Sequence, residues 1–248
     1  MTRTSATWIL LLVLLLPQTA AGFFGSLDSL QAEFKKIESG GEGEELTEIL
    51  NQLDEVSGTV RFKDVPDGVW FHRYVSSVAR WKIVSGYKDA SGNPTGDFGP
   101  GNPVTVAEIL KIAYGSSERD TETCTRTPQH PEAANHWSRI FVACAEDEGV
   151  RIIVAQASLN RAATRAEVLS VIHDVFKERV PPLLSSFSDT AGHTFESDIA
   201  FAAAMGIVSG DKDASKNATG TFRPDDMVNR AEAAKIIYEK LRVEVLSE

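Results

Sequence analysis

Apolar residues recur at helical spacing through most of the chain beyond residue 60, in short stretches separated by clusters of Gly, Asp, Asn and Pro. Such spacing is typical of one buried face of an α-helix, and the polar clusters are typical of turns, with Gly96 and Gly220 as positions for positive φ. The apolar positions are Ile109, Ile112 and Ala113 in one stretch and Ala233, Ile236 and Ile237 in another. The pattern predicts a mostly α fold of short helices.

A capping signal marks the start of three of these helices. In each, a residue that can cap a helix is followed three positions later by Glu, which is the reciprocal capping box. The pairs are Thr105 with Glu108, Thr164 with Glu167, and Asn229 with Glu232. We assign these six side chains a structural role and no ligand role of their own.

The chain also repeats itself. Residues 85–114 align without a gap onto residues 209–238, and a shorter copy begins at Thr164. Internal repetition indicates an array of similar supersecondary units. We therefore expect three helix–loop–helix units, at residues 62–115, at 116–179 (a divergent copy) and at 187–241.

Several short motifs resemble those of the S-layer homology domain, which normally occurs as three tandem copies. They are Phe62-x-Asp64-Val65, Trp70, Ile83-Val84-Ser85-Gly86-Tyr87, Thr164-Arg165-Ala166-Glu167 and Phe222-Arg223-Pro224. The resemblance implies a pseudo-threefold helical bundle at the outer cell surface, in the cell wall or an S-layer. It also implies that grooves between the repeats bind a cell-wall-linked polysaccharide, often one with pyruvylated sugars, and so anchor the protein.

The first sixty residues differ from the repeats. Residues 1–21 combine a basic flank, an apolar run and a small-residue exit, as in an export signal peptide, and the run is too short to span a bilayer. We expect no membrane span in the mature protein. Within residues 22–60 the spacing predicts two short helices. They pack on the repeats, form a partly ordered stalk, or contact another surface protein through residues 23–60.

The formal net charge of −10 argues against a nucleic-acid partner, which requires clustered Lys and Arg. It also means that long-range attraction does not draw in an anionic wall polymer, so local cations and donors must hold any anion.

Cys124 and Cys144 are the only cysteines. An even count in an exported chain indicates a disulfide, here closing a loop of about twenty residues and worth roughly 3 kcal/mol. The alternative is one buried thiol and one free thiol. No Cys-x-x-Cys pair indicates a metal site.

The best candidates for ligand binding are Arg165 and Arg230, each the second residue of a capping box. At a helix N-terminus, free backbone N–H groups and the helix dipole favour an anion, and a guanidinium adds a bidentate donor for a carboxylate. The alternative is an ion pair to a carboxylate of a neighbouring repeat. Val106 stands where the first copy would carry this arginine, so we expect at most two working sites.

Trp70 and Trp137 are a second set of candidates. An indole can stack on a sugar face and donate its N–H to a hydroxyl, or it can belong to the core between repeats. In the third copy Thr194 occupies the corresponding place.

Asp64 and Asp189 match the opening Asp of the resembled family. Each is interpreted as a helix cap or as an acceptor for a sugar hydroxyl. Gly86 and Gly210 are expected where the backbone geometry requires glycine, and they leave room for a ligand.

Two loops carry alternating oxygen side chains, at residues 89–95 and 213–219, as a calcium loop does. The twelfth position, which should be a bidentate Glu, is Pro100 or Pro224, so an Asx-turn is the default interpretation. We expect no metal and no cofactor.

No motif indicates catalysis: the five histidines form no His-Glu-x-x-His helix, and no Gly-x-Ser-x-Gly elbow is present. The repeats end near Leu241, so we expect no attached catalytic domain and no enzyme activity. The leading hypothesis is a wall-binding module. The alternative is an envelope-structural protein whose repeats pack against protein and no longer bind glycan.

Overall fold

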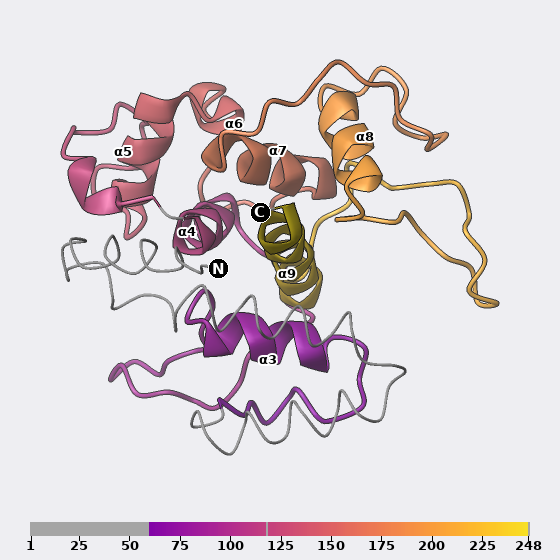
Figure 1. Cartoon of the computed structure of the whole chain (residues 1–248). Coiled ribbons are helices and arrows are strands. Elements are labelled where there is room, and N and C mark those ends of the chain that lie inside the picture. Colours follow the sequence, from indigo (N-terminus) through magenta and orange to yellow (C-terminus); the bar gives the residue numbers. More distant parts are fainter. Residues whose placement is uncertain (1–59, 118, 248) are drawn as a thin grey trace, which may run out of the picture.

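The computed structural model describes residues 60–117 and 119–247, with no side chains for the last three of these, and the described part is mostly helical (Figure 1). It contains isolated β-bridges and no β-sheet. The elements are α3 (His72–Arg80), α4 (Val106–Ser116), the 3₁₀ turn η1 (Thr121–Thr123), α5 (Arg139–Glu148), α6 (Arg151–Val154), α7 (Arg165–Val175), α8 (Glu196–Ala204) and α9 (Arg230–Ser247). The predicted export signal and the two short helices predicted within residues 22–60 lie outside the described residues.

Three helices form the centre of the fold. Helix α4 packs against both α7 and α9, and α7 is buried almost all round. A helix that is apolar on every side requires neighbours on every side, which places α7 in the core rather than at the surface. Its fully buried apolar residues are Ala166, Val168, Leu169, Val171, Ile172 and Val175.

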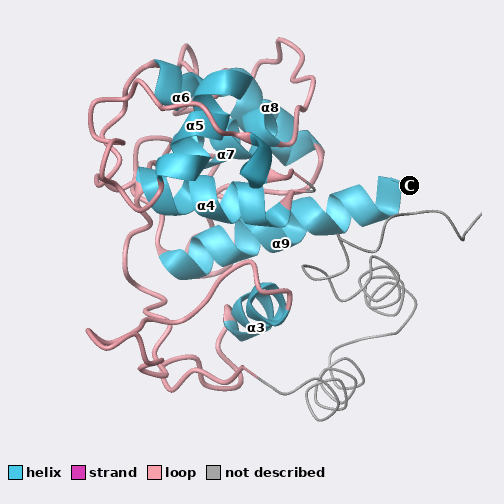
Figure 2. Cartoon of the chain, turned by 90° about the vertical axis from the view of Figure 1, so that its left-hand side faces the viewer, coloured by secondary structure: helices cyan, strands magenta, loops and turns pink. Residues whose placement is uncertain are grey.

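The outer helices each pack on a central helix from a different part of the chain. Helix α3 packs on α9, α5 packs on α4, and α8 packs on α7 (Figures 1 and 2). In the first of these contacts, the indole of Trp81, which ends α3, stacks on the Tyr238 ring with centroids 5.7 Å apart. Because α3 and α9 come from opposite ends of the described chain, this contact joins the first predicted unit to the third.

At the start of each central helix, backbone N–H groups are hydrogen-bonded to a loop from elsewhere in the chain. The first two backbone N–H groups of α4, α7 and α9 donate to loop carbonyls at 2.9–3.1 Å. The pairs are Val106 to Arg161 and Ala107 to Leu159, Arg165 to Asp226 and Ala166 to Pro224, Arg230 to Asn102 and Ala231 to Pro100. These bonds satisfy groups that a helix leaves unpaired at its N-terminus.

The third N–H group at each of these helix starts is held by a capping box. In α4, Thr105 Oγ1 accepts from the Glu108 N–H at 3.2 Å, and Glu108 Oε2 accepts from the Thr105 N–H at 2.8 Å. The same reciprocal bonds link Thr164 with Glu167 and Asn229 with Glu232.

A disulfide joins Cys124, which follows η1, to Cys144 in α5. Cys144 is buried, and the bridge ties the irregular segment before α5 to that helix. None of the described helices is long and apolar enough to cross a membrane.

Candidate functional site

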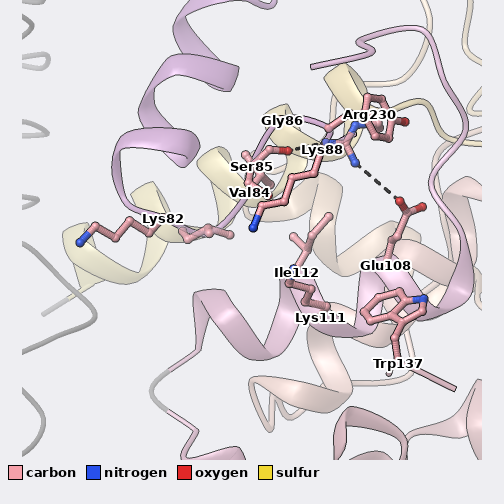
Figure 3. A pocket seen from close by; sticks show the side chains of 12 residues that line it. Lys82, Val84, Ser85, Gly86, Lys88, Glu108, Lys111, Ile112, Trp137 and Arg230 are labelled. Atoms are coloured by element: carbon pink, nitrogen blue, oxygen red, sulfur yellow. Dashed lines mark hydrogen bonds and ion pairs between the residues drawn. The ribbon is translucent and has the colours of Figure 1, made fainter. Parts of the chain in front are cut away.

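A pocket of about 280 Å³ lies where the loop after α3, helix α4 with Trp137 from the segment before α5, and the start of α9 meet (Figure 3). This volume is close to the lower end of small-molecule sites, which begin at about 300 Å³. The polar and aromatic residues that line it are Lys82, Ser85, Tyr87, Lys88, Glu108, Lys111, Trp137 and Arg230.

Arg230 is fixed at the back of this pocket. Its Nε donates to the Phe98 carbonyl and its Nη2 to the Ser85 carbonyl, both at 2.8 Å. Its guanidinium lies 4.5 Å from the centre of the Phe98 ring and 4.9 Å from that of Tyr87. The remaining Nη1 is 3.7 Å from Glu108 Oε1. The guanidinium is therefore held rigidly, with one edge directed at a carboxylate that also lines the pocket.

Trp137 forms an exposed aromatic wall on the other side of the pocket. It lies just before α5, its relative exposure is 54%, and its ring meets the edge of Phe141 at 6.5 Å. The Lys111 ammonium lies 6.0 Å from the indole centre. The core interpretation of Trp137 is wrong, because more than half of its surface is open to solvent.

Cations outnumber anions around the pocket. Lys82, Lys88, Lys111 and Arg230 line it, with Glu108 as the one carboxylate among the lining residues. The three lysines are exposed, and Lys82 points away from the pocket centre (Figure 3). In a chain of net charge −10 this local excess favours an anionic ligand. No sequence motif singled out these lysines, although Lys88 and Lys111 recur as Lys212 and Lys235 in the gapless alignment.

Arg165 has a related environment at the start of α7. Its Nε donates to the Phe222 carbonyl at 2.8 Å, its guanidinium lies 4.6 Å from the Phe222 ring centre, and Nη1 is 3.6 Å from Glu232 Oε1. Burial lowers the pKa of Arg165, while Glu232 and Asp211 raise it. Both predicted arginines thus make the ion pair to a neighbouring segment that the sequence left open as the alternative.

The expected free N–H groups at these two helix starts are not available. The N–H groups of Arg165 and Arg230, and of the residues that follow them, donate to loop carbonyls. An anion at either place would therefore be held by side chains, with no help from unpaired backbone donors.

Trp70 is also exposed, at 56%, and packs on Phe71 with ring centres 5.4 Å apart. It does not line the pocket described above. The core interpretation is wrong for Trp70 as well.

Asp64 and Asp189 do not cap helices, which was one of the two roles expected from the sequence. Asp64 accepts from the N–H groups of Phe98 and Gly99 at 2.8 and 2.7 Å, and Asp189 accepts from those of Phe222 and Arg223 at 2.9 and 2.7 Å. Neither caps a helix, because the residues preceding α3 and α8 are Phe71 and Phe195. The carboxylates clamp the loops that lead to α4 and α9.

Glu132 has the same role in the divergent middle segment. Its Oε2 accepts from the Leu159 N–H at 2.8 Å, and that hydrogen bond lowers the pKa of Glu132. Glu132 could not be recognised from the Phe-x-Asp motif, because Glu replaces Asp and His130 stands where the phenylalanine would be.

Gly86 and Gly210 lie where a loop backbone and an aromatic ring leave no room for a side chain. A Cβ on Gly86 would be 2.7 Å from the Phe62 ring, and one on Gly210 would be 2.4 Å from the Phe187 ring. Gly86 lines the pocket, but these close contacts explain why glycine is needed at both positions.

The absent arginine at Val106 has a local substitute. Arg161 Nη1 donates to Glu167 Oε2 at 2.8 Å. The Glu of the Thr164–Glu167 capping box therefore also pairs with a guanidinium, as Glu108 and Glu232 do. The arginine comes from the same segment as Glu167 rather than from a distant one.

The loops at 89–95 and 213–219 form Asx-turns. Asp89 Oδ1 accepts from the N–H groups of Ser91 and Asn93, and Asp213 Oδ1 from those of Ser215 and Asn217. Within the described residues no group of three or more His, Cys, Asp or Glu side chains is arranged to hold a metal ion.

Comparison with known proteins supports the resemblance. Residues 186–234 match the S-layer homology domain family. An uncharacterized cell wall amidase of Bacillus anthracis is 24% identical over 186 residues, which cover 72% of this chain and 31% of the amidase. The chain therefore spans less than a third of the length of that relative.

Proposed function

The chain carries an S-layer homology domain at residues 186–234, and we propose that it is exported and binds a cell-wall-linked polysaccharide non-covalently through the pocket around Arg230. Domains of this family generally anchor proteins to the wall by binding a secondary cell-wall polymer. The bound chain would anchor itself, or a partner that it carries, to the envelope. We propose a binding role and no catalytic one.

The observation that carries this proposal is the meeting of an exposed indole with a cluster of cations. Trp137 presents an open aromatic face, and Lys88, Lys111 and Arg230 line the same pocket. A pyranose ring with one apolar face can pack on the indole while its hydroxyl groups remain hydrated at the rim. The pocket therefore suits a sugar that also bears a negative charge.

The charge of the ligand would be met by side chains. A carboxylate, such as a pyruvyl ketal, accepts charge-assisted hydrogen bonds from ammonium and guanidinium groups. Arg230 is stacked between two rings and bonded to two carbonyls, so little conformational entropy is lost when it receives a ligand. Lys88 and Lys111 are exposed, so their ammonium groups are accessible to a ligand that enters the pocket.

The amidase likeness does not extend this proposal to catalysis. Amidase activity is a property stated for the relative, of which this chain spans 31%. Catalytic activity is not required for the anchoring role that we propose.

Co-sedimentation with purified sacculi from the host tests the proposal. The wild-type chain is expected to pellet with intact sacculi and to stay soluble with sacculi stripped of their secondary polysaccharide. Trp137→Ala and Lys111→Ala are each expected to raise the apparent Kd for sacculi at least about tenfold, a loss of about 1.4 kcal/mol. Both residues are exposed, so these variants should remain folded.

Trp70→Ala is the matched control, because Trp70 is equally exposed and does not line the pocket. It is expected to pellet as the wild type does. If wild type stays in the supernatant, or if Trp70→Ala and Trp137→Ala lose binding equally, the proposed pocket is wrong. A wild type that fails to pellet directs the search to a protein partner.

A further inference from the structure

The surroundings of Arg165 and Arg230 share one plan but differ at several positions that bear on ligand binding. Each guanidinium donates to the carbonyl of a phenylalanine, lies on that ring and faces the Glu of a capping box. The second neighbour of Arg230 is the phenol of Tyr87, at 4.9 Å. In the gapless alignment, the position of Tyr87 is occupied by Asp211.

Asp211 is held by a second arginine. Arg223 Nε donates to Asp211 Oδ2 at 2.7 Å and Nη2 to Oδ1 at 2.9 Å, a bidentate pair. Its Nη1 donates to Asp226 at 2.8 Å. These bonds from Arg223 lower the pKa of Asp211, so its carboxylate is ionised at neutral pH.

The backbone conformation of Arg223 is energetically unfavourable. Its φ is +57°, a conformation that disfavours any residue with a Cβ by about 1–2 kcal/mol. The aligned position is Gly99, at φ +72°, where a Cβ would be 2.5 Å from the Tyr87 ring and 2.7 Å from Asn102. Glycine at 99 thus leaves space for the hydrogen bond from Asn102 to the Tyr87 hydroxyl, at 2.9 Å.

The charges around the two arginines follow from these substitutions. Around Arg230, Lys82, Lys88 and Lys111 line a pocket with the single carboxylate of Glu108. On the Arg165 side the lysines aligned with Lys88 and Lys111 are kept, as Lys212 and Lys235. The carboxylates of Glu232 and Asp211, however, both act on the Arg165 guanidinium, and Arg223 is already paired. Gly206 also replaces the lysine at position 82. An anion approaching Arg165 would be repelled by two carboxylates. The Arg223 guanidinium could bind that anion only by breaking its ion pair with Asp211.

We infer that this chain binds one anionic glycan per molecule, in the Arg230 pocket, because the Asp211–Arg223 pair neutralises the corresponding site at Arg165. This inference rests on the proposed function and adds to it which arginine receives the ligand. Asp211 and Arg223 are then specificity-determining residues. The Asp211 carboxylate, held by Arg223, lies near Arg165 where the negative group of a ligand would otherwise bind.

The stoichiometry of binding tests this inference. The ligand used is the polysaccharide released from host sacculi and cut to single repeating units, titrated into the full chain by calorimetry. One site per chain is expected for the wild type. Lys111→Ala is expected to weaken binding at least tenfold, whereas Lys235→Ala, the aligned lysine beside Tyr74, is expected to leave it unchanged.

A gain-of-site variant tests the role of the ion pair directly. The triple substitution Asp211→Tyr, Arg223→Gly and Asp226→Asn reproduces Tyr87, Gly99 and Asn102 of the Arg230 pocket. It is expected to raise the stoichiometry from one to two. The circular dichroism of the variant shows whether it folds, and the Lys111 and Lys235 variants decide the question if it does not.

The outcomes separate the two ideas. Two sites in the wild type, equal weakening by Lys235→Ala and Lys111→Ala, or a folded triple variant that still binds one ligand overturns the inference alone. No binding by the wild type in either calorimetry or co-sedimentation overturns the proposed function, and this inference with it.

Discussion

Arg230 at the start of α9 and Glu108 at the start of α4 bring Nη1 and Oε1 within 3.7 Å of each other, although they lie far apart in the sequence. Glu108 uses its other oxygen, Oε2, to accept from the Thr105 N–H. One carboxylate therefore completes a helix cap and faces a guanidinium from another helix. Because Arg230 also lines the pocket proposed to bind glycan, variants of Arg230 are expected to change both stability and binding.

Arg230→Ala is expected to destabilise the fold as well as weaken binding. It removes charged hydrogen bonds to the carbonyls of Phe98 and Ser85 from a side chain that is 10% exposed. Hydrogen bonds to charged groups contribute about 1.5–3 kcal/mol each, so losing the two should cost about 3–6 kcal/mol. Urea unfolding measures it, with Arg126→Ala as the control.

Arg126 is 47% exposed and pairs with Glu146 and Asp147 at the surface, where such ion pairs contribute at most about 1 kcal/mol. Equal losses from the two arginine variants would contradict the structural role assigned to Arg230.

Gly210→Ala and Gly220→Ala are expected to differ. Both positions have positive φ, at +67° and +78°, but a Cβ on Gly210 would lie 2.4 Å from the Phe187 ring, whereas nothing lies within 4 Å of one on Gly220. The left-handed backbone costs about 1–2 kcal/mol in each, and overpacking adds about 1–3 kcal/mol at Gly210. Thermal unfolding should show the larger loss for Gly210→Ala, and similar losses would contradict the close contact.

Removing the disulfide is expected to destabilise the chain without changing the Arg230 pocket. The bridge joins Cys124 and Cys144, twenty positions apart, and its loss costs about 3 kcal/mol in the chain-entropy description. The double variant Cys124→Ser, Cys144→Ser and the reduced wild type should unfold at the same, lower urea concentration. A wild type whose midpoint does not respond to a reductant would show that the bridge does not form.

Acid is expected to weaken the fold through Asp198, which is 2% exposed. Burial raises the pKa of Asp198, but hydrogen bonds from His173 Nδ1 at 2.9 Å and from Arg151 outweigh it, so the folded pKa lies below the unfolded value of about 3.9. The stabilisation is therefore complete above that value and is lost as the pH falls through the folded pKa.

Asp198→Asn is expected to cost about 3 kcal/mol at neutral pH, because it breaks a buried, charged network. The variant should also lose less stability than the wild type between about pH 4 and pH 2, since the group that titrates is gone. Urea unfolding at a series of pH values measures both effects. Parallel pH profiles for the two proteins would contradict the role of Asp198.

Local sequence chemistry was sufficient to predict some parts of the site and not others. The capping boxes at Thr105, Thr164 and Asn229 involve atoms within three residues of one another, so a short motif contains all the information needed. Asp64 has the opposite character: it was expected to cap a helix or receive a sugar, and it clamps a loop more than thirty residues away. Its motif identified an important residue but did not indicate its partner.

The motifs of the chain gave the resemblance to the S-layer homology domain, which the family match at residues 186–234 supports. The sequence by itself also determined that the chain forms short helices with defined starts and that it repeats. These properties depend on hydrogen bonds and apolar spacing within a few turns of chain. Only the tertiary structure decided that Trp137 and Lys111 share a pocket with Arg230 and that Asp211 and Arg223 pair beside Arg165. These arrangements depend on side chains brought together from distant segments, and the burial and charge of each group follow from neighbours that no local pattern specifies.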